Sequence, residues 1–300
     1  MKSKKKASFA ASAAIAGMIV AAPAFATEGG GSSYPMGADS YLSGAVPPPG
    51  FYTVLFAERY SADTLRDNNG NKVPVNFKVT ANVVAPRFIW VTDKKVLGGD
   101  LLHAAIIPLV NLDVNVNGAG QSKSGLGDIL FTVFGLAYHH SPNLHSVAAL
   151  DIIIPSGSYN RSDMTNIGRN YWAIQPLYTV SYVNPQGWNA DAKIMMDFNR
   201  KNKDTNYRSG QEFHVDYAVG YGFGNNWVAG VGGYLYRQTS DDKLNGVTVA
   251  NNRGRAFAIG PSIKYDNGKG FFLTAKYQVE TEVRNRADGK ALWVKALLPF

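Results

Sequence analysis

The sequence contains no cysteine among its 300 residues. A disulfide framework and a thiolate metal site are therefore both excluded. Charged residues are also scarce, at 17% of the chain against about 25% in an average globular protein. Aromatic residues, at 12%, and 31 glycines are plentiful instead, a mixture that suits strands joined by tight turns. The composition thus favours an all-β protein.

The first 26 residues have the pattern of a secretory signal peptide. Four lysines precede an apolar run from Ala7 to Ala22, and Ala24-Phe25-Ala26 supplies a small-x-small cleavage site. Cleavage after Ala26 removes four of the 30 basic residues and leaves a net charge of +4 without a basic cluster, which argues against a nucleic-acid partner. After Ala26 no apolar stretch reaches 18 residues, so no membrane helix is expected in the mature chain. The two remaining classes are a soluble exported β protein and an outer-membrane barrel.

From Phe51 onward, apolar and polar residues alternate with a period of two. Residues 188–198, 213–223 and 271–283 show this most clearly, each with one apolar face and one polar or small face. About twelve such strands are predicted, and most exceed the 9–11 residues that a tilted strand needs to cross a bilayer. They lie at 51–60, 73–91, 101–116, 127–139, 144–155, 170–183, 188–200, 211–223, 227–239, 254–266, 271–284 and 290–300.

The connections alternate in length from the fourth predicted strand on. Short turns are predicted at 141–143, 184–187, 224–226 and 267–270, and longer polar loops at 156–169, 201–210 and 240–253. The aromatic residues beside the short turns are Tyr138, Tyr182, Trp188, Phe223, Trp227, Tyr265 and Phe271. Short periplasmic turns, long extracellular loops and an aromatic girdle are typical of outer-membrane barrels. We therefore predict an all-β fold in residues 51–300, a transmembrane antiparallel up-and-down β-barrel of the bacterial outer membrane with both termini on the periplasmic side.

The last predicted strand ends on Phe300, with apolar residues at Leu292, Val294, Ala296 and Leu298 in period two. A terminal aromatic with this spacing resembles the signal read by the outer-membrane assembly machinery. That machinery and the outer-membrane lipids are therefore expected partners. Pairing of this strand with the first one would close the barrel and leave no exposed edge.

If the apolar face of each strand meets lipid, the other face lines a lumen. A twelve-strand barrel is wider than the eight-strand barrel that side chains alone can fill, and ionisable residues facing such an interior mark a solute pathway. The alternative is that opposed charges only brace the wall. The predicted lumen-lining residues are Lys78, His103, Asp113, Asp128, His145, Asp151, Gln175, Asp191, Lys193, Asp197, His214, Asp216, Lys264, Lys276, Glu280, Glu282 and Lys295.

Residues 27–50 are rich in glycine, serine and proline and have no periodicity. We expect this irregular segment either to form a periplasmic tail or to fold into the barrel mouth. In the second case Tyr34, Met36 and Tyr41, which come just before the first strand, would belong to a plug that gates the lumen.

An outer-membrane lipid hydrolase is the least favoured function. Such an enzyme needs serine, histidine and a polar partner together on the lipid-facing surface. His139 and His140 lie near Ser141 at a strand end, but a Gly-x-Ser-x-Gly motif is missing. The three remaining histidines are predicted to face the lumen. We expect no enzymatic activity, no metal and no cofactor.

Six segments of the chain resemble the outer-membrane proteins grouped as involved in the meta-pathway of phenol degradation. They are EGGGSSYPMGA at 28–38, APR at 85–87, GDI at 127–129, HHSP at 139–142, NYW at 170–172 and DYA at 216–218. The resemblance covers essentially the whole mature chain. It implies a channel or uptake protein that passes small aromatic or hydrophobic solutes without energy input. A non-transporting structural or adhesive surface barrel, whose long loops would carry the function, is the alternative.

Overall fold

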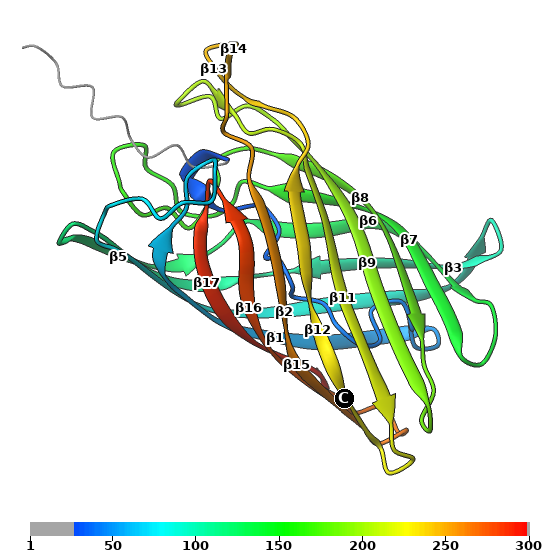
Figure 1. Ribbon diagram of the computed structural model, residues 1–300. Helices are drawn as coiled ribbons and strands as arrows, with labels where there is room; N and C mark the ends of the chain where they lie inside the picture. Colours follow the sequence, from blue (N-terminus) through cyan, green and yellow to red (C-terminus); the bar gives the residue numbers. More distant parts are fainter. Residues whose placement is uncertain (1–26, 299–300) are drawn as a thin grey trace, which may run out of the picture.

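A computed structural model of the protein describes residues 27–298, which form one closed antiparallel β-barrel (Figure 1). The wall is built from β1 (Gly50–Leu65), β2 (Phe77–Val96), β3 (Gly99–Ile106), β4 (Leu109–Val116), β5 (Ala119–Leu126), β6 (Ile129–His139), β7 (Leu144–Ile154), β8 (Ala173–Tyr182), β9 (Trp188–Asn199), β11 (Glu212–Gly222), β12 (Trp227–Gln238), β15 (Arg255–Asp266), β16 (Phe272–Arg284) and β17 (Ala287–Leu298). A small separate sheet in the long loops consists of β10 (Tyr207–Arg208), β13 (Asp242–Leu244) and β14 (Val247–Val249), and one short 3-10 helix, η1 (Glu28–Gly30), precedes them all.

The fourteen wall strands make twelve membrane crossings, because β3 and β4 together form one crossing and β5 and β6 together form another. β3 and β4 both pair with β2, and β5 and β6 pair with β4 and β3 in turn. The interruptions lie near Pro108, which has no N–H to donate to the ladder, and near Gly127, whose amide donates to the Pro108 carbonyl. The predicted fold and strand number are thus confirmed. The predicted fourth strand misses β5, since the sequence AGQSKSGL has no apolar face.

The barrel closes between its first and last strands. β1 pairs with β17 from Thr53↔Leu298 to Leu65↔Ala287, and its other edge pairs with β2. Every wall strand except β5 therefore has a strand on both sides, which closes the ring. β5 pairs with β4 alone, and Thr165 of a long loop hydrogen-bonds to Gln121 of β5. Phe300, on which the predicted assembly signal rests, lies outside the described residues.

Side chains of the wall alternate between an outward apolar face and an inward, mostly polar face. On β12, Val231 and Leu235 are 44% and 41% exposed, whereas Tyr234 and Tyr236 point inward and are 1% and 0% exposed. A continuous apolar outer band of this kind is at home in hydrocarbon and would be unfavourable in water. The barrel is therefore an outer-membrane protein. Within residues 27–298 no helix has the length and hydropathy to cross a membrane.

Aromatic side chains gather at the end of the barrel that carries the short turns. Trp188 contacts Tyr221 with 5.7 Å between ring centroids, and Tyr265 contacts both Trp227, at 5.0 Å, and Phe271, at 6.4 Å. Amphipathic rings prefer the membrane–water interface, and short turns are periplasmic in barrels of this class. We take this end as periplasmic and the long-loop end as extracellular.

The alternation of turn lengths is not complete. The short turns predicted between β6 and β7, β8 and β9, β11 and β12, and β15 and β16 are all present. Two further tight turns, Asn117-Gly118 and Asn285-Arg286, fall at the extracellular end. Asn117 and Gly118 have φ values of 53° and 89°, the left-handed conformation that a two-residue hairpin requires.

Candidate channel lumen

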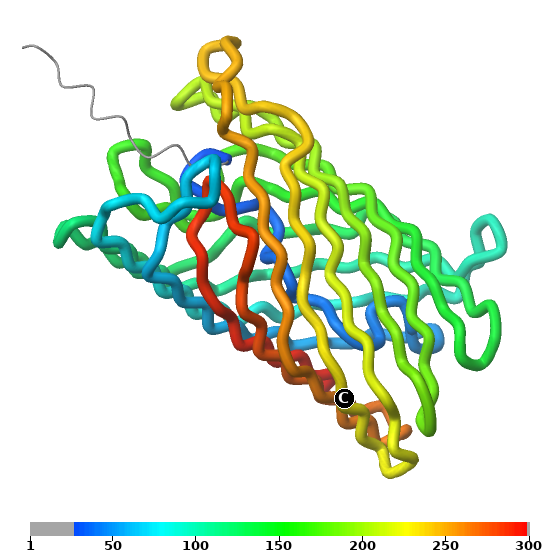
Figure 2. Tube along the Cα trace, viewed as in Figure 1, coloured from blue at the N-terminus to red at the C-terminus, as the bar shows by residue number. Residues whose placement is uncertain are grey.

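Residues 27–49 run along the inside of the barrel from its extracellular end to its periplasmic end (Figure 2). At the extracellular end, the amide nitrogen of Thr27 lies 3.3 Å from Asp242 Oδ2. Near the periplasmic end, the amide of Gly44 donates to Ser181 Oγ on β8 at 2.8 Å. We call this stretch the lumen segment. It lies within the barrel rather than below it as a periplasmic tail.

The lumen segment is irregular because its sequence gives it no strand partner. Gly37 has a φ of +75°, and a Cβ there would lie 2.4 Å from the Gln278 side chain. The buried backbone amides must find acceptors elsewhere. Asp216 on β11 supplies two of them, since its carboxylate accepts from the amide of Gly37 at 2.7 Å and from that of Asp39 at 2.9 Å.

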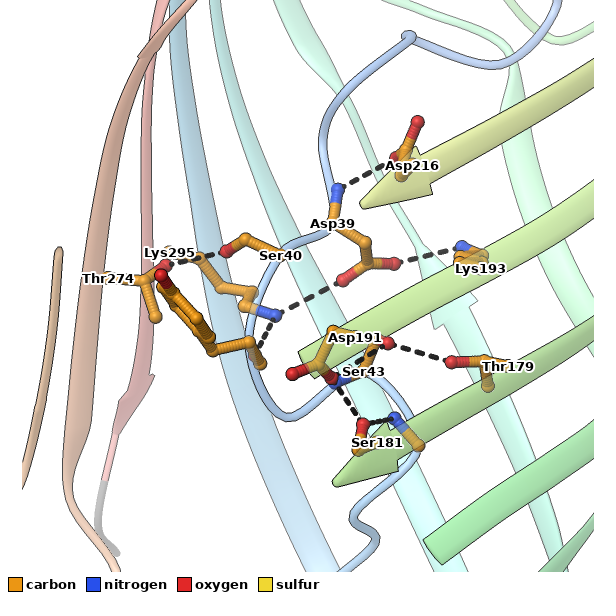
Figure 3. A network of polar contacts seen from close by, with 12 residues as sticks. Asp39, Ser40, Ser43, Thr179, Ser181, Asp191, Lys193, Asp216, Thr274 and Lys295 are labelled. Carbon is orange, nitrogen blue, oxygen red and sulfur yellow. Dashed lines mark hydrogen bonds and ion pairs between the residues drawn. The ribbon is translucent and has the colours of Figure 1, made fainter. Parts of the chain in front are cut away.

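Asp39 is the ionic centre of the lumen segment (Figure 3). Its carboxylate accepts from Lys193 Nζ on β9 at 2.9 Å and from Lys295 Nζ on β17 at 3.2 Å. β9 and β17 stand on nearly opposite sides of the ring, so one carboxylate joins the two walls across the interior. Lys276 Nζ on β16 donates to the Asp39 carbonyl at 2.9 Å and adds a third cation.

Tyr34 extends this polar network toward the extracellular end. Its hydroxyl donates to Asp216 Oδ2 at 3.2 Å and accepts from Lys193 Nζ at the same distance. The Lys193 ammonium also lies 4.5 Å from the centre of the Tyr34 ring, a cation–π geometry. The ring thereby contacts the side chain that neutralises Asp39.

Tyr41 fills a notch that two glycines leave in the wall. A Cβ at Gly220 would lie 2.4 Å from the Tyr41 hydroxyl oxygen, and one at Gly230 would lie 2.8 Å from it. The hydroxyl shares a 2.9 Å hydrogen bond with Ser262 Oγ. Met36 makes the apolar contact of the segment, since it clusters with Tyr234 and neighbouring buried residues of β12, β15 and β16.

The periplasmic part of the lumen segment is held by hydroxyl groups and one carboxylate. The Ser43 amide donates to Asp191 Oδ1 at 3.0 Å, and its hydroxyl shares a 2.7 Å hydrogen bond with Thr179 (Figure 3). Ser181 donates to the same Asp191 carboxylate. These groups tie the segment to β8 and β9.

The extracellular anchor is the carboxylate of Asp242, which is fully buried, as is Thr27. Besides the Thr27 amide it accepts from the Tyr207 hydroxyl at 2.5 Å, from the Gly210 amide at 2.7 Å and from Gln238 Nε2 at 2.7 Å. The anchor therefore joins the lumen segment to the long loops.

Ten of the predicted lining residues are inside the barrel and at most 5% exposed. They are Asp151, Gln175, Asp191, Lys193, Asp197, His214, Asp216, Lys264, Lys276 and Lys295. Three others also face inward. Asp128 accepts from the amides of Gly157 and Arg169, His145 contacts His139, and Glu280 accepts from Tyr60.

Lys78 and Asp113 face outward, contrary to the prediction. Lys78 is exposed and alternates with the buried, inward-facing Phe77, and Asp113 pairs with Thr80 on the same outer face as Lys78. The reason is length. β2 and the combined β3 and β4 extend beyond the apolar band, so a polar residue there faces water rather than the lumen.

His103 and Glu282 were also predicted to line the lumen, but both face outward. His103 lies opposite Trp90, which is 55% exposed on the outer face, with 5.8 Å between the rings. Glu282 occupies a bulge in β16 with a φ of +52° and forms an ion pair with Arg255 outside the barrel. The bulge reverses the alternation, so that Val283 points inward instead.

Sequence reasoning missed several charged residues of the lumen, among them Asp39, Glu212 and Arg286. Asp39 could not be assigned to the lumen because residues 27–50 show no alternation of polar and apolar residues. Glu212 is buried and accepts from Ser32, and the Arg286 guanidinium lies 4.3 Å from the Tyr236 ring centre. Glu212 precedes the predicted His214 by two residues, so its position on the same face was available as a signal.

The serine and histidine residues considered for hydrolysis do not pair as that hypothesis requires. His140 Nε2 lies 2.8 Å from Ser146 Oγ, while Ser141 Oγ accepts from the amides of Asn143 and Leu144 in its own turn. Among residues 27–298 no cluster of three or more histidine, aspartate or glutamate side chains is arranged to hold a metal ion.

Solved structures with this fold are outer-membrane barrels. The COG4313 outer membrane channel from Pseudomonas putida F1 superposes with a TM-score of 0.76 at 19% identity, covering 86% of this chain and 97% of that one. The translocator domain of the autotransporter NalP from Neisseria meningitidis gives 0.48 at 9% identity, covering 85% and 91%. The CymD monoaromatic hydrocarbon channel gives 0.36 at 11% identity, covering 83% and 87%. The first likeness establishes the fold.

No curated protein matches the sequence. A family model does match, over residues 62–296, which is most of the wall described above. Its description is "Putative MetA-pathway of phenol degradation", in agreement with the resemblance found in the sequence. The chain belongs to this family of outer-membrane barrels.

Proposed function

We propose that the protein is an outer-membrane channel through which small aromatic or moderately hydrophobic solutes cross passively, and that the lumen segment is the plug that closes it. The observation that carries the proposal is the buried bridge from Asp39 to Lys193 and Lys295 inside a closed barrel. The family description, which names phenol degradation, supports an aromatic solute.

The plug is suited to reversible movement because polar contacts hold most of it. Water can replace those partners when the segment leaves, and a typical hydrogen bond contributes only about 0.5–1.5 kcal/mol net. Lys193, Lys295 and Asp216 would then be hydrated in a lumen wider than side chains alone can fill. Apolar packing is concentrated at Met36 and at Tyr41.

Aromatic side chains of the wall support an aromatic solute. Tyr60, Tyr234, Tyr236 and Trp293 face inward on β1, β12 and β17, and the last three are at most 3% exposed behind the plug. Rings of this kind stack with phenolic rings, tyrosine hydroxyls pair with phenolic oxygens, and neighbouring lysine ammonium groups attract the ring face. Withdrawal of the plug would expose this lining to the solute.

The decisive experiment is liposome swelling with phenolic solutes and sugars of similar size. Wild-type protein is compared with a variant that lacks residues 30–44 and retains the cleavage site. Phenolic solutes are expected to enter faster than sugars, and the deletion is expected to raise the rates and the single-channel conductance. Equal rates for both solutes would indicate a general porin and remove the aromatic preference.

A non-transporting surface barrel is the second candidate, and the filled lumen favours it. Planar-bilayer recordings separate the two functions. A deletion variant that folds but passes no current would establish the surface role, and unchanged conductance would reject gating by the segment.

We also propose that Phe300 is read by the outer-membrane assembly machinery. The support is the period-two pattern of β17, whose inward Trp293 and outward Leu292 continue to the seam with β1. Deleting Phe300 is expected to lower the amount of heat-modifiable barrel in outer-membrane fractions. Normal assembly without it would reject the proposal.

A further inference from the structure

Three arginines lie side by side on the outer surface of the barrel at its extracellular end. They are Arg237 on β12, Arg255 on β15 and Arg284 on β16, and the register pairs Arg237 with Arg255 and Arg255 with Arg284. All three are exposed. Cβ atoms of directly opposite residues are about 4.5–5.5 Å apart, and like charges in such positions are destabilising. This arginine row therefore needs a source of negative charge.

The protein itself supplies only part of that charge. Glu282, on its bulge, pairs with Arg255. Arg237 and Arg284 make no hydrogen bond or ion pair with any residue from 27 to 298. Two guanidinium groups of the row thus remain available to an anion.

The nearby loop carboxylate of Asp241 is already used. It accepts from Arg253 Nε at 2.7 Å and from Arg253 Nη2 at 3.1 Å. These hydrogen bonds lower the pKa of Asp241 from its usual value, so the carboxylate stays ionised and neutralises Arg253. Asp241 is therefore not a partner for the two remaining arginines of the row.

The arginine row lies where the apolar band ends. On β12 the outward face runs from Trp227 at the periplasmic aromatic ring through Val231 and Leu235 to Arg237. The ten residue-to-residue steps from Trp227 to Arg237, at about 3.3 Å each and tilted by about 40°, span about 25 Å, which is the usual height of the apolar band. The guanidinium groups are thus at the level of the headgroups of the outer leaflet.

A surface depression of about 950 Å³ adjoins the row and combines two chemistries. Phe213, Leu235 and Phe257 give it an apolar wall on the side of the bilayer, while Arg237, Arg255 and Arg284 line it on the side of the loops. A guanidinium fork matches two oxygens of a phosphate, and the apolar wall matches acyl chains. A free phosphate would use only the first of these features.

We propose that the arginine row binds the phosphate group of an acylated outer-leaflet lipid of the lipid A type, whose chains lie against Phe213, Leu235 and Phe257. The lipid completes the charge balance of the row and covers the depression. Because the inward faces of β12, β15 and β16 pack against Met36, the same strands hold the lipid outside and the lumen segment inside. The site is independent of the transported solute.

The test uses the full mature protein in detergent and measures lipid binding by native mass spectrometry. The probes are bisphosphorylated lipid A, the same lipid without phosphates, and inorganic phosphate alone. The variant Arg237→Gln/Arg255→Gln/Arg284→Gln is compared with Arg161→Gln/Lys201→Gln/Lys203→Gln, which removes three exposed loop charges at the same end. Heat-modifiable migration checks folding, and Arg237→Gln/Arg284→Gln, which leaves the pair of Arg255 with Glu282, is the reserve variant.

Wild-type protein is expected to bind bisphosphorylated lipid A at least about tenfold more tightly than the dephosphorylated lipid, and the row variant is expected to lose this difference. The loop variant should retain it. Equal binding by the row variant, or equal binding of the dephosphorylated lipid, would overturn the proposal. If inorganic phosphate displaces lipid A and binds as tightly as lipid A does, the row is a site for small anions, and the lipid assignment is overturned.

Discussion

The ammonium of Lys193 lies 2.9 Å from the carboxylate of Asp39, and neither side chain is more than 5% exposed. One group belongs to the wall and the other to the lumen segment. Removing one partner of a buried ion pair commonly costs about 3–5 kcal/mol, because the remaining charge is left without compensation. This contact is therefore where a small substitution should act most strongly on the plug.

Replacing Asp39 by asparagine keeps the shape of the side chain and removes its charge from between Lys193 and Lys295. The lysines then gain more from water than from the segment, so the plug should leave the lumen more often. We expect at least a several-fold rise in open-channel conductance events in planar bilayers. Asp241→Asn, in an exposed loop, is the control, and wild-type conductance of both Asp39→Asn and Asp39→Ala would contradict the gating role of this ion pair.

Gly220 and Tyr41 should be energetically coupled. In Gly220→Ala the new Cβ would lie 2.4 Å from the Tyr41 hydroxyl oxygen, so the tyrosine must move. Pairs of residues in contact usually show coupling of about 0.5–3 kcal/mol. We therefore expect Tyr41→Ala to recover part of the stability lost in Gly220→Ala, as measured by urea unfolding in a double-mutant cycle. If the two stability losses simply add, Gly220 is required because of its neighbours in the sheet and not because of Tyr41. The Ala229 carbonyl oxygen would lie 2.8 Å from the same Cβ, so the stability lost through that contact should not be recovered by Tyr41→Ala.

Processing after Ala26 should place the α-amino group on Thr27. The intact mass of protein purified from outer membranes should then correspond to residues 27–300. In that case the ammonium group lies beside the buried Asp242 carboxylate and forms an ion pair with it. A mass that includes residues before Thr27 would disprove the expected cleavage site.

Asp242→Asn should release the extracellular end of the lumen segment. The asparagine cannot neutralise the terminal ammonium and loses charge-assisted hydrogen bonds from Tyr207 and Gly210. Labelling of the Thr27 amine by a membrane-impermeant reagent on intact cells should become faster by about tenfold. Asp204→Asn in a neighbouring loop provides the comparison, and equal labelling rates in the two variants would count against the anchor.

The wall could be predicted from sequence because its determinants are local. A period of two marks each strand, and turn-forming residues such as Asn184-Pro185-Gln186-Gly187 mark where it ends. The wrong predictions concern residues for which alternation alone does not decide whether the side chain faces the lumen or the outside. The strand that contains Lys78 continues past the bilayer, where a polar side chain can face outward into water. The bulge at Glu282 moves the following residues to the other face.

The closed lumen could not be derived in the same way. Asp39 meets Lys193 and Lys295, which are 154 and 256 residues away in the chain, and nothing periodic in its own segment announces those partners. The sequence left two places open for the segment, and only the tertiary arrangement distinguishes them. Tyr34, Met36 and Tyr41 were singled out by residue type, whereas the ionic centre between them was not.

The path of the lumen segment gives it one covalent tether and one end that is held by side-chain contacts alone. The segment is joined covalently to the wall only at its periplasmic end, where it enters β1 at Gly50, and processing would leave Thr27 as a free end facing outside. We therefore expect that a lumen segment whose polar contacts have been exchanged for water stays attached to the barrel at Gly50. The same molecule can then return to the same contacts without having to find a separate partner.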